Sequence, residues 1–99
     1  MSERTKLTPC TCLSHDEKSG RLKIEVEMPG ADKNHMKLDM RKDSFCVTAP
    51  RGEEAEYSSC FNLSREVEPE KAEARFENGL LRIFAPIKDW EHKYSVQVQ

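Results

Sequence analysis

The sequence has no long apolar run and no excess of charge of either sign. No stretch approaches the roughly 20 apolar residues needed to span a bilayer, and the first ten residues, MSERTKLTPC, lack the apolar centre of a secretion signal. Its 16 basic and 18 acidic residues are interspersed and leave a formal net charge of −2, so they form no basic stripe for nucleic acid. We therefore expect a cytoplasmic protein that binds neither nucleic acid nor a membrane.

Sequence motifs of catalysis are also missing. There is no glycine-rich phosphate loop, no G-x-S-x-G turn and no carboxylate pair whose spacing stands out from the general charge. Three histidines, His15, His35 and His92, fall in polar segments without metal-binding spacing or a neighbouring nucleophile motif. We expect surface histidines, no enzyme activity and no cofactor.

Cysteine is present four times, at Cys10, Cys12, Cys46 and Cys60. Without an export signal, reduced thiols are expected rather than a disulfide framework. A zinc site is the alternative, but paired zinc ligands are usually spaced C-x2-4-C on turns, whereas this chain has one C-x-C and two single cysteines within predicted strands. We expect small, apolar sheet residues and no metal, and stoichiometric zinc in the purified protein would contradict this.

What the chain does contain is alternation of apolar and polar residues, the two-residue period of half-buried strands. It is clearest at Leu22, Ile24, Val26 and Met28, where each apolar residue is followed by a charged one or by proline. Shorter or weaker alternations cover residues 10–14, 36–41, 44–49, 57–63 and 94–98. Helix-favouring residues over 64–76 suggest a helix instead, but Pro69 in the middle argues against it.

The segment 72–86, AEARFENGLLRIFAP, predicts a hairpin with a defined register. Asn78-Gly79 suits a two-residue turn with positive φ at both positions. That turn pairs Glu77 with Leu80, Phe76 with Leu81, Ala74 with Ile83 and Ala72 with Ala85. One face of the hairpin is then apolar throughout, whereas the other face places Arg75 opposite Arg82, an unfavourable pair of like charges.

Seven or eight short strands with turns every eight to twelve residues predict an all-β fold, an antiparallel immunoglobulin-like β-sandwich. The 99 residues, 36% hydrophobic and 34% charged, are enough for one domain with a small core. We expect a short flexible tail over residues 1–8, the domain over 9–87 and a C-terminal extension over 88–99.

Three stretches resemble a known family. Residues 74–83, ARFENGLLRI, are similar to a motif near the end of the α-crystallin domain of small heat-shock proteins. Residues 28–33, MPGADK, with Pro29 and Gly30, resemble that family's leucine-proline-glycine turn. Residues 61–64, FNLS, followed by Val67-Glu68-Pro69, resemble its F-x-L-P stretch. The resemblance spans roughly residues 8–98 and implies the sandwich deduced above from periodicity.

The resemblance also implies a function, that of an ATP-independent stress-response chaperone, or holdase, which holds partly unfolded client proteins at apolar strand edges. The family's groove for a neighbour's I-x-I or V-x-V segment corresponds here to Met36, Leu38, Met40, Ala72, Ala74 and Phe76. Val96-Gln97-Val98 has the form of the docking segment, although V-x-V alternation also fits a last strand of the chain's own sheet or a frayed end. Trp90 either caps the hairpin or stays exposed.

Three departures from the family pattern limit what the resemblance implies. Only about nine residues precede the first predicted strand, the connection 50–56 is too short for a swapped dimerisation loop, and Ser59 stands where many members have arginine. We therefore expect a monomer or small dimer rather than a large shell. The alternative function is a compact adaptor similar to CS-type co-chaperone domains, which binds one defined protein partner.

Overall fold

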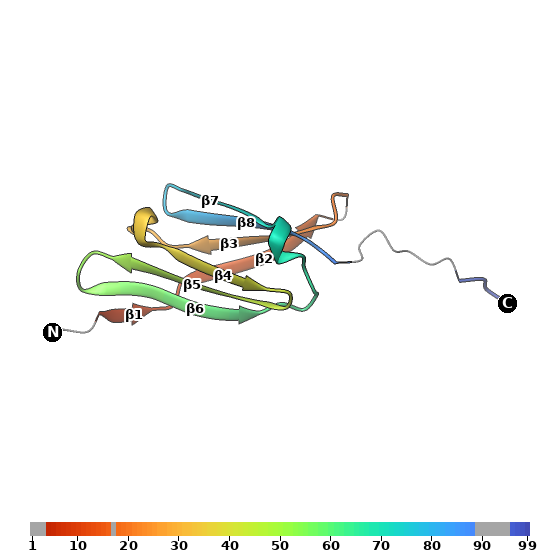
Figure 1. Cartoon of the computed structure of the whole chain (residues 1–99), viewed down its shortest axis with the longest axis horizontal. Coiled ribbons are helices and arrows are strands. Elements are labelled where there is room, and N and C mark those ends of the chain that lie inside the picture. Colours follow the sequence, from red (N-terminus) through yellow and green to blue (C-terminus); the bar gives the residue numbers. More distant parts are fainter. Residues whose placement is uncertain (1–3, 17, 89–95) are drawn as a thin grey trace.

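The computed structural model describes residues 4–16, 18–88 and 96–99. Within these residues eight strands form two four-stranded sheets, which confirms the expected β-sandwich (Figure 1). Sheet A has the order β1 (Thr5–Leu7), β6 (Ala55–Asn62), β5 (Ser44–Arg51), β4 (Lys37–Arg41). Sheet B has the order β2 (Cys10–Asp16), β3 (Arg21–Glu27), β8 (Leu80–Pro86), β7 (Glu73–Glu77). No helix in these ranges is long and apolar enough to cross a membrane.

The strand β1 lies inside segment 1–8, for which the sequence predicted a tail. It pairs parallel to β6, with Thr5 opposite Ala55 and Leu7 opposite Tyr57, whereas every other strand pair in the described ranges is antiparallel. Sheet A is therefore mixed. Three residues with one apolar side chain are too few for a two-residue period to be recognised.

Two short 3-10 helices, η1 (Lys33–His35) and η2 (Pro69–Lys71), occur between strands. The alternative helix over 64–76 is therefore reduced to η2, which begins at Pro69 and is followed by β7. Proline is tolerated there because the first N–H groups of a helix have no partner within it.

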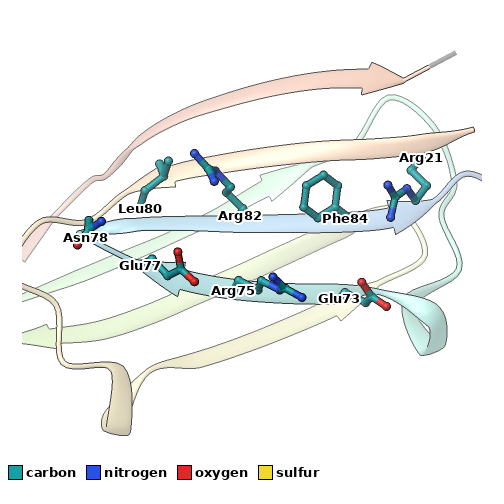
Figure 2. A pocket seen from close by; sticks show the side chains of 8 residues that line it. All are labelled: Arg21, Glu73, Arg75, Glu77, Asn78, Leu80, Arg82 and Phe84. Carbon is teal, nitrogen blue, oxygen red and sulfur yellow. The ribbon is translucent and has the colours of Figure 1, made fainter. Parts of the chain in front are cut away.

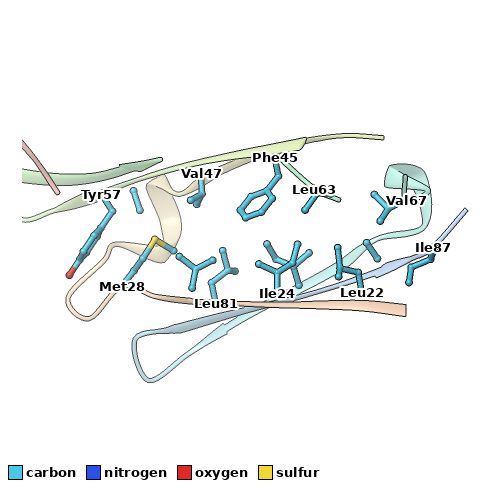
Figure 3. Packing of buried hydrophobic residues seen from close by; sticks show 14 residues of the cluster. Leu22, Ile24, Met28, Phe45, Val47, Tyr57, Leu63, Val67, Leu81 and Ile87 are labelled. Carbon is cyan, nitrogen blue, oxygen red and sulfur yellow. The ribbon is translucent and has the colours of Figure 1, made fainter. Parts of the chain in front are cut away.

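The core lies between the sheets and is built from the inward-facing residues of the predicted alternations (Figure 3). Ile24, Val26, Met28, Val47 and Ile83 have no exposed surface, and Phe45 has 1%. The remaining buried apolar residues are Leu22, Ala49, Tyr57, Leu63, Val67, Leu81, Ala85 and Ile87. Burial of one face of each central strand specifies the register, because a shift by one residue would expose that face.

The hairpin of β7 and β8 has the register that the turn predicted. Glu77 pairs with Leu80, Phe76 with Leu81, Ala74 with Ile83 and Arg75 with Arg82. Asn78 and Gly79 have φ of 50° and 78°, the positive values expected for the turn. Ala72 precedes β7 and ends η2, so its predicted strand pairing with Ala85 does not form part of the β7–β8 ladder.

Two of the stretches that carried the family resemblance meet at one end of the sandwich. The backbone N–H of Met28 donates to the carbonyl oxygen of Gly79 at 2.7 Å. A Cβ at Gly79 would lie 3.0 Å from the Cα of Pro29. The hydroxyl of Tyr57 also donates to the carbonyl oxygen of Pro29, at 2.7 Å. We call the residues Met28, Pro29, Tyr57, Asn78 and Gly79 the turn junction.

The prediction that all four cysteines are reduced is wrong for two of them. Cys46 on β5 lies directly opposite Cys60 on β6, and the two form a disulfide with a Cα–Cα distance of 4.0 Å. Direct opposition across an antiparallel pair brings the two side chains onto one face at bonding distance. Cys10 and Cys12 are free and exposed on the edge strand β2, as expected for reduced thiols.

Candidate docking surface

The candidate site lies between two sheet edges that have no strand partner within the described residues. The strand β4 ends sheet A and pairs only with β5, and β7 ends sheet B and pairs only with β8. The helices η1 and η2, which precede these two strands, lie at opposite ends of the sandwich, so β4 and β7 run in opposite directions (Figure 1). Each edge leaves backbone N–H and C=O groups available to an added strand.

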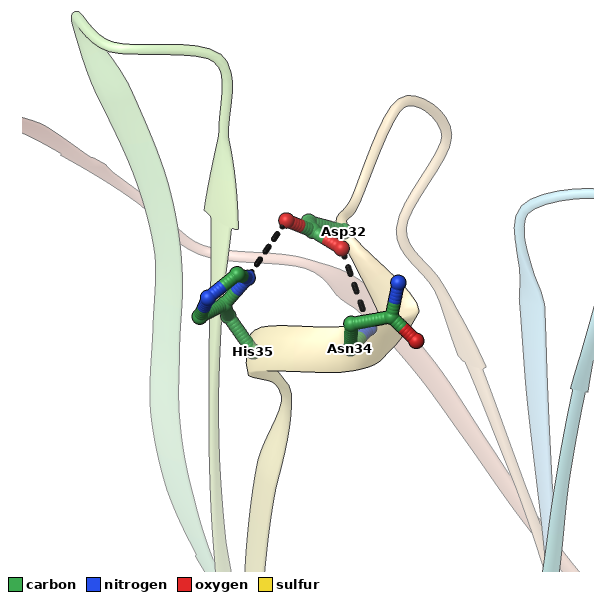
Figure 4. A network of polar contacts seen from close by, with 3 residues as sticks. All are labelled: Asp32, Asn34 and His35. Atoms are coloured by element: carbon green, nitrogen blue, oxygen red, sulfur yellow. Dashed lines mark hydrogen bonds and ion pairs between the residues drawn. The ribbon is translucent and has the colours of Figure 1, made fainter.

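The start of β4 is fixed by a network of hydrogen bonds around Asp32 (Figure 4). One carboxylate oxygen of Asp32 accepts from the backbone N–H of Asn34 at 2.9 Å, and the other contacts Nδ1 of His35 at 2.7 Å. These contacts lower the pKa of Asp32 below its ordinary value, the His35 hydrogen bond being the larger cause. The N–H of Asp32 also donates to the carbonyl of Pro50, which ties η1 to β5. Asp32 therefore caps η1, the turn that leads into Met36.

The start of β7 is fixed in a similar way by η2. The N–H of Glu68 donates to the carbonyl of Pro86 at 2.8 Å, and the N–H of Ala72 donates to that of Pro69 at 3.1 Å. Val67 is 1% exposed and forms an isolated bridge with Ile87. The buried valine and the two hydrogen bonds hold Ala72 at the entry to β7.

Five of the six predicted groove residues are partly buried and pack against the core. They are Met36, Leu38 and Met40 from the β4 side and Ala72 and Phe76 from the β7 side. Ala74, the sixth, is exposed, although it shares the core-facing side of β7 with Phe76. We call these six residues the β4–β7 strip. The six residues named for the groove thus lie along two sheet edges, and Ala74 is the one among them that is exposed rather than partly buried.

The predicted docking segment is separate from the sheets. Residues 96–99 belong to no strand, and Val96 and Val98 are 83% and 93% exposed. They do not complete the sheet of their own chain, which was one of the two alternatives to docking, the other being a frayed end. Trp90 and His92, for which the sequence also raised expectations, lie outside the described residues.

The outer face of sheet B carries a second feature that the sequence predicted only in part. A hollow of about 500 Å³ lies over β7 and β8, and its lining includes Glu73, Glu77 and three arginines, two of which are the opposed Arg75 and Arg82 (Figure 2). The third, Arg21, comes from β3. By contrast, no group of three histidine, cysteine, aspartate or glutamate side chains in the described ranges could hold a metal ion.

Comparison with known proteins identifies the fold. No model of a protein family and no curated protein sequence matches the chain. Among solved structures, heat shock protein 16.0 from Schizosaccharomyces pombe superposes with a TM-score of 0.75 and 16% identity over 95% of this chain and 77% of its own. HSP18.5 from E. histolytica gives 0.76 and 13% over 94% and 98%. The hspA protein from Xanthomonas axonopodis gives 0.71 and 16% over 83% and 95%.

These neighbours are small heat-shock proteins and match this chain over most of its length, so the expected α-crystallin-domain fold is confirmed. At 13% to 16% identity the likeness establishes the arrangement of the strands. The function of the chain has to be argued from its own surfaces, because one fold supports several functions.

Proposed function

We propose that this protein is an ATP-independent chaperone of the holdase type, which binds partly unfolded proteins at the β4–β7 strip. One observation carries the proposal: apolar side chains packed on the core remain partly exposed between two strand edges that have no partner among residues 4–16, 18–88 and 96–99. An extended segment of an unfolded protein can add to such an edge through main-chain hydrogen bonds while alternate side chains cover the strip. The fold shared with small heat-shock proteins supports the same function.

The composition of the strip suits partners of varied sequence. Met36 and Met40 are unbranched and polarisable, so they adapt to side chains of different shape. Leu38 lies between them on the same side of β4. Specificity for clients would therefore come from exposed apolar side chains and a free backbone, both of which mark an unfolded chain.

A second occupant of the strip is the V-x-V segment of a neighbouring copy. Val96 and Val98 are exposed and spaced by two residues, so both can enter an apolar strip from one face of an extended segment. We propose that this contact gives at most a small oligomer, with monomer or dimer favoured. Replacing both valines by glycine should lower the mass measured by light scattering, and an unchanged mass would show that the segment assembles nothing.

The chaperone function is tested by the aggregation of several unrelated heated proteins at a near-stoichiometric ratio. The wild-type protein should suppress aggregation of each of them, whereas Leu38→Asp should lose this effect because a carboxylate on the strip resists burial. Ala74→Arg gives a second test, because it adds bulk at an exposed position and removes no core contact. Thermal melting of each variant shows whether the fold is retained.

The matched control is Leu13→Asp, the same change on the opposite edge strand β2, where Leu13 is 45% exposed. It should suppress aggregation as the wild type does. If Leu13→Asp loses suppression while folded Leu38→Asp and Ala74→Arg retain it, the strip is not the site. If the wild-type protein protects no client and captures a single partner in a pull-down, the adaptor function replaces the holdase function.

A further inference from the structure

The outer face of sheet B brings three arginines, Arg21, Arg75 and Arg82, together around one hollow. Arg75 and Arg82 lie directly opposite each other on β7 and β8, an arrangement that destabilises a sheet. Glu25 reduces the repulsion at Arg82, because its carboxylate lies 3.5 Å from the Nε of Arg82. The same carboxylate also lies 3.6 Å from Nζ of Lys23. Arg75 forms no ion pair with any residue in the described ranges.

The arginine pair is flanked by apolar side chains along β8 and by the carboxylates of Glu73 and Glu77 along β7. Along β8 the outward side chains are Leu80, Arg82 and Phe84, because the alternate residues face the core. The guanidinium of Arg21 lies over the ring of Phe84, 4.9 Å from its centroid. Glu73 and Glu77 line the hollow from β7, on the same face as Arg75, and neither forms an ion pair with it. Figure 2 shows this order, with Leu80 at the turn end and Arg21 at the other.

A local arrangement that costs stability without an evident structural gain is a mark of a functional surface. We propose that this hollow is a second binding site, which takes an extended acidic segment of another protein. The segment would present an apolar residue, an aspartate or glutamate, and a second apolar residue at alternate positions. This proposal does not rest on the β4–β7 strip, which belongs to the opposite face of β7.

The chemistry of the hollow selects this ligand. A guanidinium matches a carboxylate with two parallel hydrogen bonds, and Arg75 is free to make them. Outward side chains along a strand repeat about every 6.8 Å, two residues of roughly 3.4 Å, and an extended segment has the same repeat. Leu80, the arginine pair and Phe84 therefore meet alternate residues of one segment. A free phosphate ion would engage the arginines but leave both apolar flanks unused.

The test uses the full chain and a fluorescent peptide of nine residues. The peptide carries leucine, aspartate and phenylalanine at positions 3, 5 and 7, with serine and glycine elsewhere. This spacing follows from the two-residue repeat of a strand. Fluorescence anisotropy should show binding that weakens as salt rises, because exposed charges are screened. Arg75→Glu should weaken binding about tenfold or more, the usual effect of losing a hydrogen bond between charged groups. A peptide with lysine in place of aspartate should not bind.

Stability separates loss of binding from loss of fold. Arg75→Glu places a carboxylate opposite Arg82, so the variant should melt at the same or a higher temperature than the wild type. The matched control is Lys6→Glu on β1 of the other sheet, an exposed position with the same change in charge. It should leave the affinity for the peptide unchanged.

Four results would overturn the proposal. The first is that the wild-type protein does not bind the peptide. The second is equal affinity of Arg75→Glu and wild type for the peptide. The third is displacement of the peptide by inorganic phosphate alone, which would indicate a simple anion site. The fourth is a smaller mass of Arg75→Glu in light scattering, which would make a second copy of the chain the occupant. None of these results depends on suppression of aggregation, so the chaperone proposal can fail or hold independently.

Discussion

The turn junction and the β4–β7 strip share the stretch 74–83, yet the junction is closed by hydrogen bonds and burial whereas the strip stays partly open. At the junction, Met28 has no exposed surface and its N–H is bonded to Gly79, while the hydroxyl of Tyr57 is bonded to Pro29. In the strip, Met36, Leu38 and Phe76 are only partly buried, and the neighbouring strand edges have no partner within the described residues. Residues of one motif can therefore be closed off by contacts in one place and stay accessible in another.

The largest expected difference concerns two residues that face each other across one hairpin. Leu81 is 3% exposed and Phe76, its partner on β7, is partly buried in the strip. Leu81→Ala should reduce the free energy of unfolding by about 2–5 kcal/mol, as for other buried leucines. Phe76→Ala should cost clearly less, because part of the ring is already in water, and should reduce client binding.

Urea unfolding followed by tryptophan fluorescence or circular dichroism measures both values. Phe76→Asp sharpens the comparison, since a charged residue unfolds a core but is tolerated at the wall of an open strip. A folded Phe76→Asp variant that still protects clients would remove Phe76 from the binding surface. Equal losses of stability for the two alanine variants would show that Phe76 belongs to the core.

The second prediction concerns a covalent constraint on sheet A. Cys46 and Cys60 are separated by 14 positions. A cross-link that closes a loop of about 15 residues lowers the conformational entropy of the unfolded chain and so stabilises the fold by about 3 kcal/mol. Replacing both by serine, or adding a reductant, should lower the free energy of unfolding by up to that amount. The strip should keep its client binding, because the disulfide links β5 to β6 and not to the edge strand β4.

The control for this prediction is the pair of free thiols. Replacing Cys10 and Cys12 by serine should change stability little, since both are exposed. Thiol titration of the unfolded, non-reduced protein should detect two free groups of the four cysteines. Four free thiols would show that the cross-link is absent under those conditions.

The sequence was informative where the signal is local. A two-residue period and an Asn-Gly turn are read over short stretches of the chain, and they predicted most of the strands and the β7–β8 register, whereas the residues of the strip were named from the family resemblance. The disulfide required the register of β5 against β6, and the connection between them contains no turn motif that would fix this register. Cys46 and Cys60 therefore looked like independent residues.

Long-range pairing explains the other features that the sequence did not predict. The strand β1 exists because Thr5–Leu7 aligns parallel to a strand 50 positions later, with Thr5 opposite Ala55. Arg21 joins the arginine hollow because β3 pairs with β8, which is a property of the assembled sheet. The contact of Gly79 with Pro29 also depends on this assembly, so the two motifs looked separate along the chain.

The third prediction tests the junction through its glycine. Gly79 has a φ of 78°, and a Cβ there would lie 3.0 Å from the Cα of Pro29, which is backbone and cannot move aside cheaply. Gly79→Ala should cost about 1–3 kcal/mol for the positive φ alone, and more for the close approach. Gly52→Ala is the matched control, because Gly52 has a φ of 67° and, apart from its chain neighbours, no atom of the described residues lies within 4 Å of the added Cβ. The loss of stability in Gly52→Ala should come from the backbone conformation alone. Equal losses of stability in the two variants would show that the contact with Pro29 contributes nothing.

The smallest expected effect is at the exposed cap that leads into the strip. The hydrogen bonds from His35 and Asn34 hold the pKa of Asp32 below its ordinary value of 3.8. A carboxyl group with a lowered pKa in the folded protein stabilises the fold fully above its ordinary value, and this contribution is lost as the pH falls through the lowered value. Asp32→Asn should therefore lessen the fall in stability below pH 4, slightly because the group is exposed, and should loosen the start of β4.

An NMR titration of the Asp32 carboxyl carbon measures this pKa directly, and His35→Ala should move it upward toward the ordinary value. Asp16, whose pKa is lowered mainly by a hydrogen bond from Ser19, is the internal control, because it lies at the end of β2 and away from the cap. Its titration should not change in His35→Ala. If client binding falls in Asp32→Asn while the melting temperature is unchanged, the cap acts by positioning Met36 and β4. The open strip would then depend on local order at its entry, as the closed junction depends on contacts made across the sandwich.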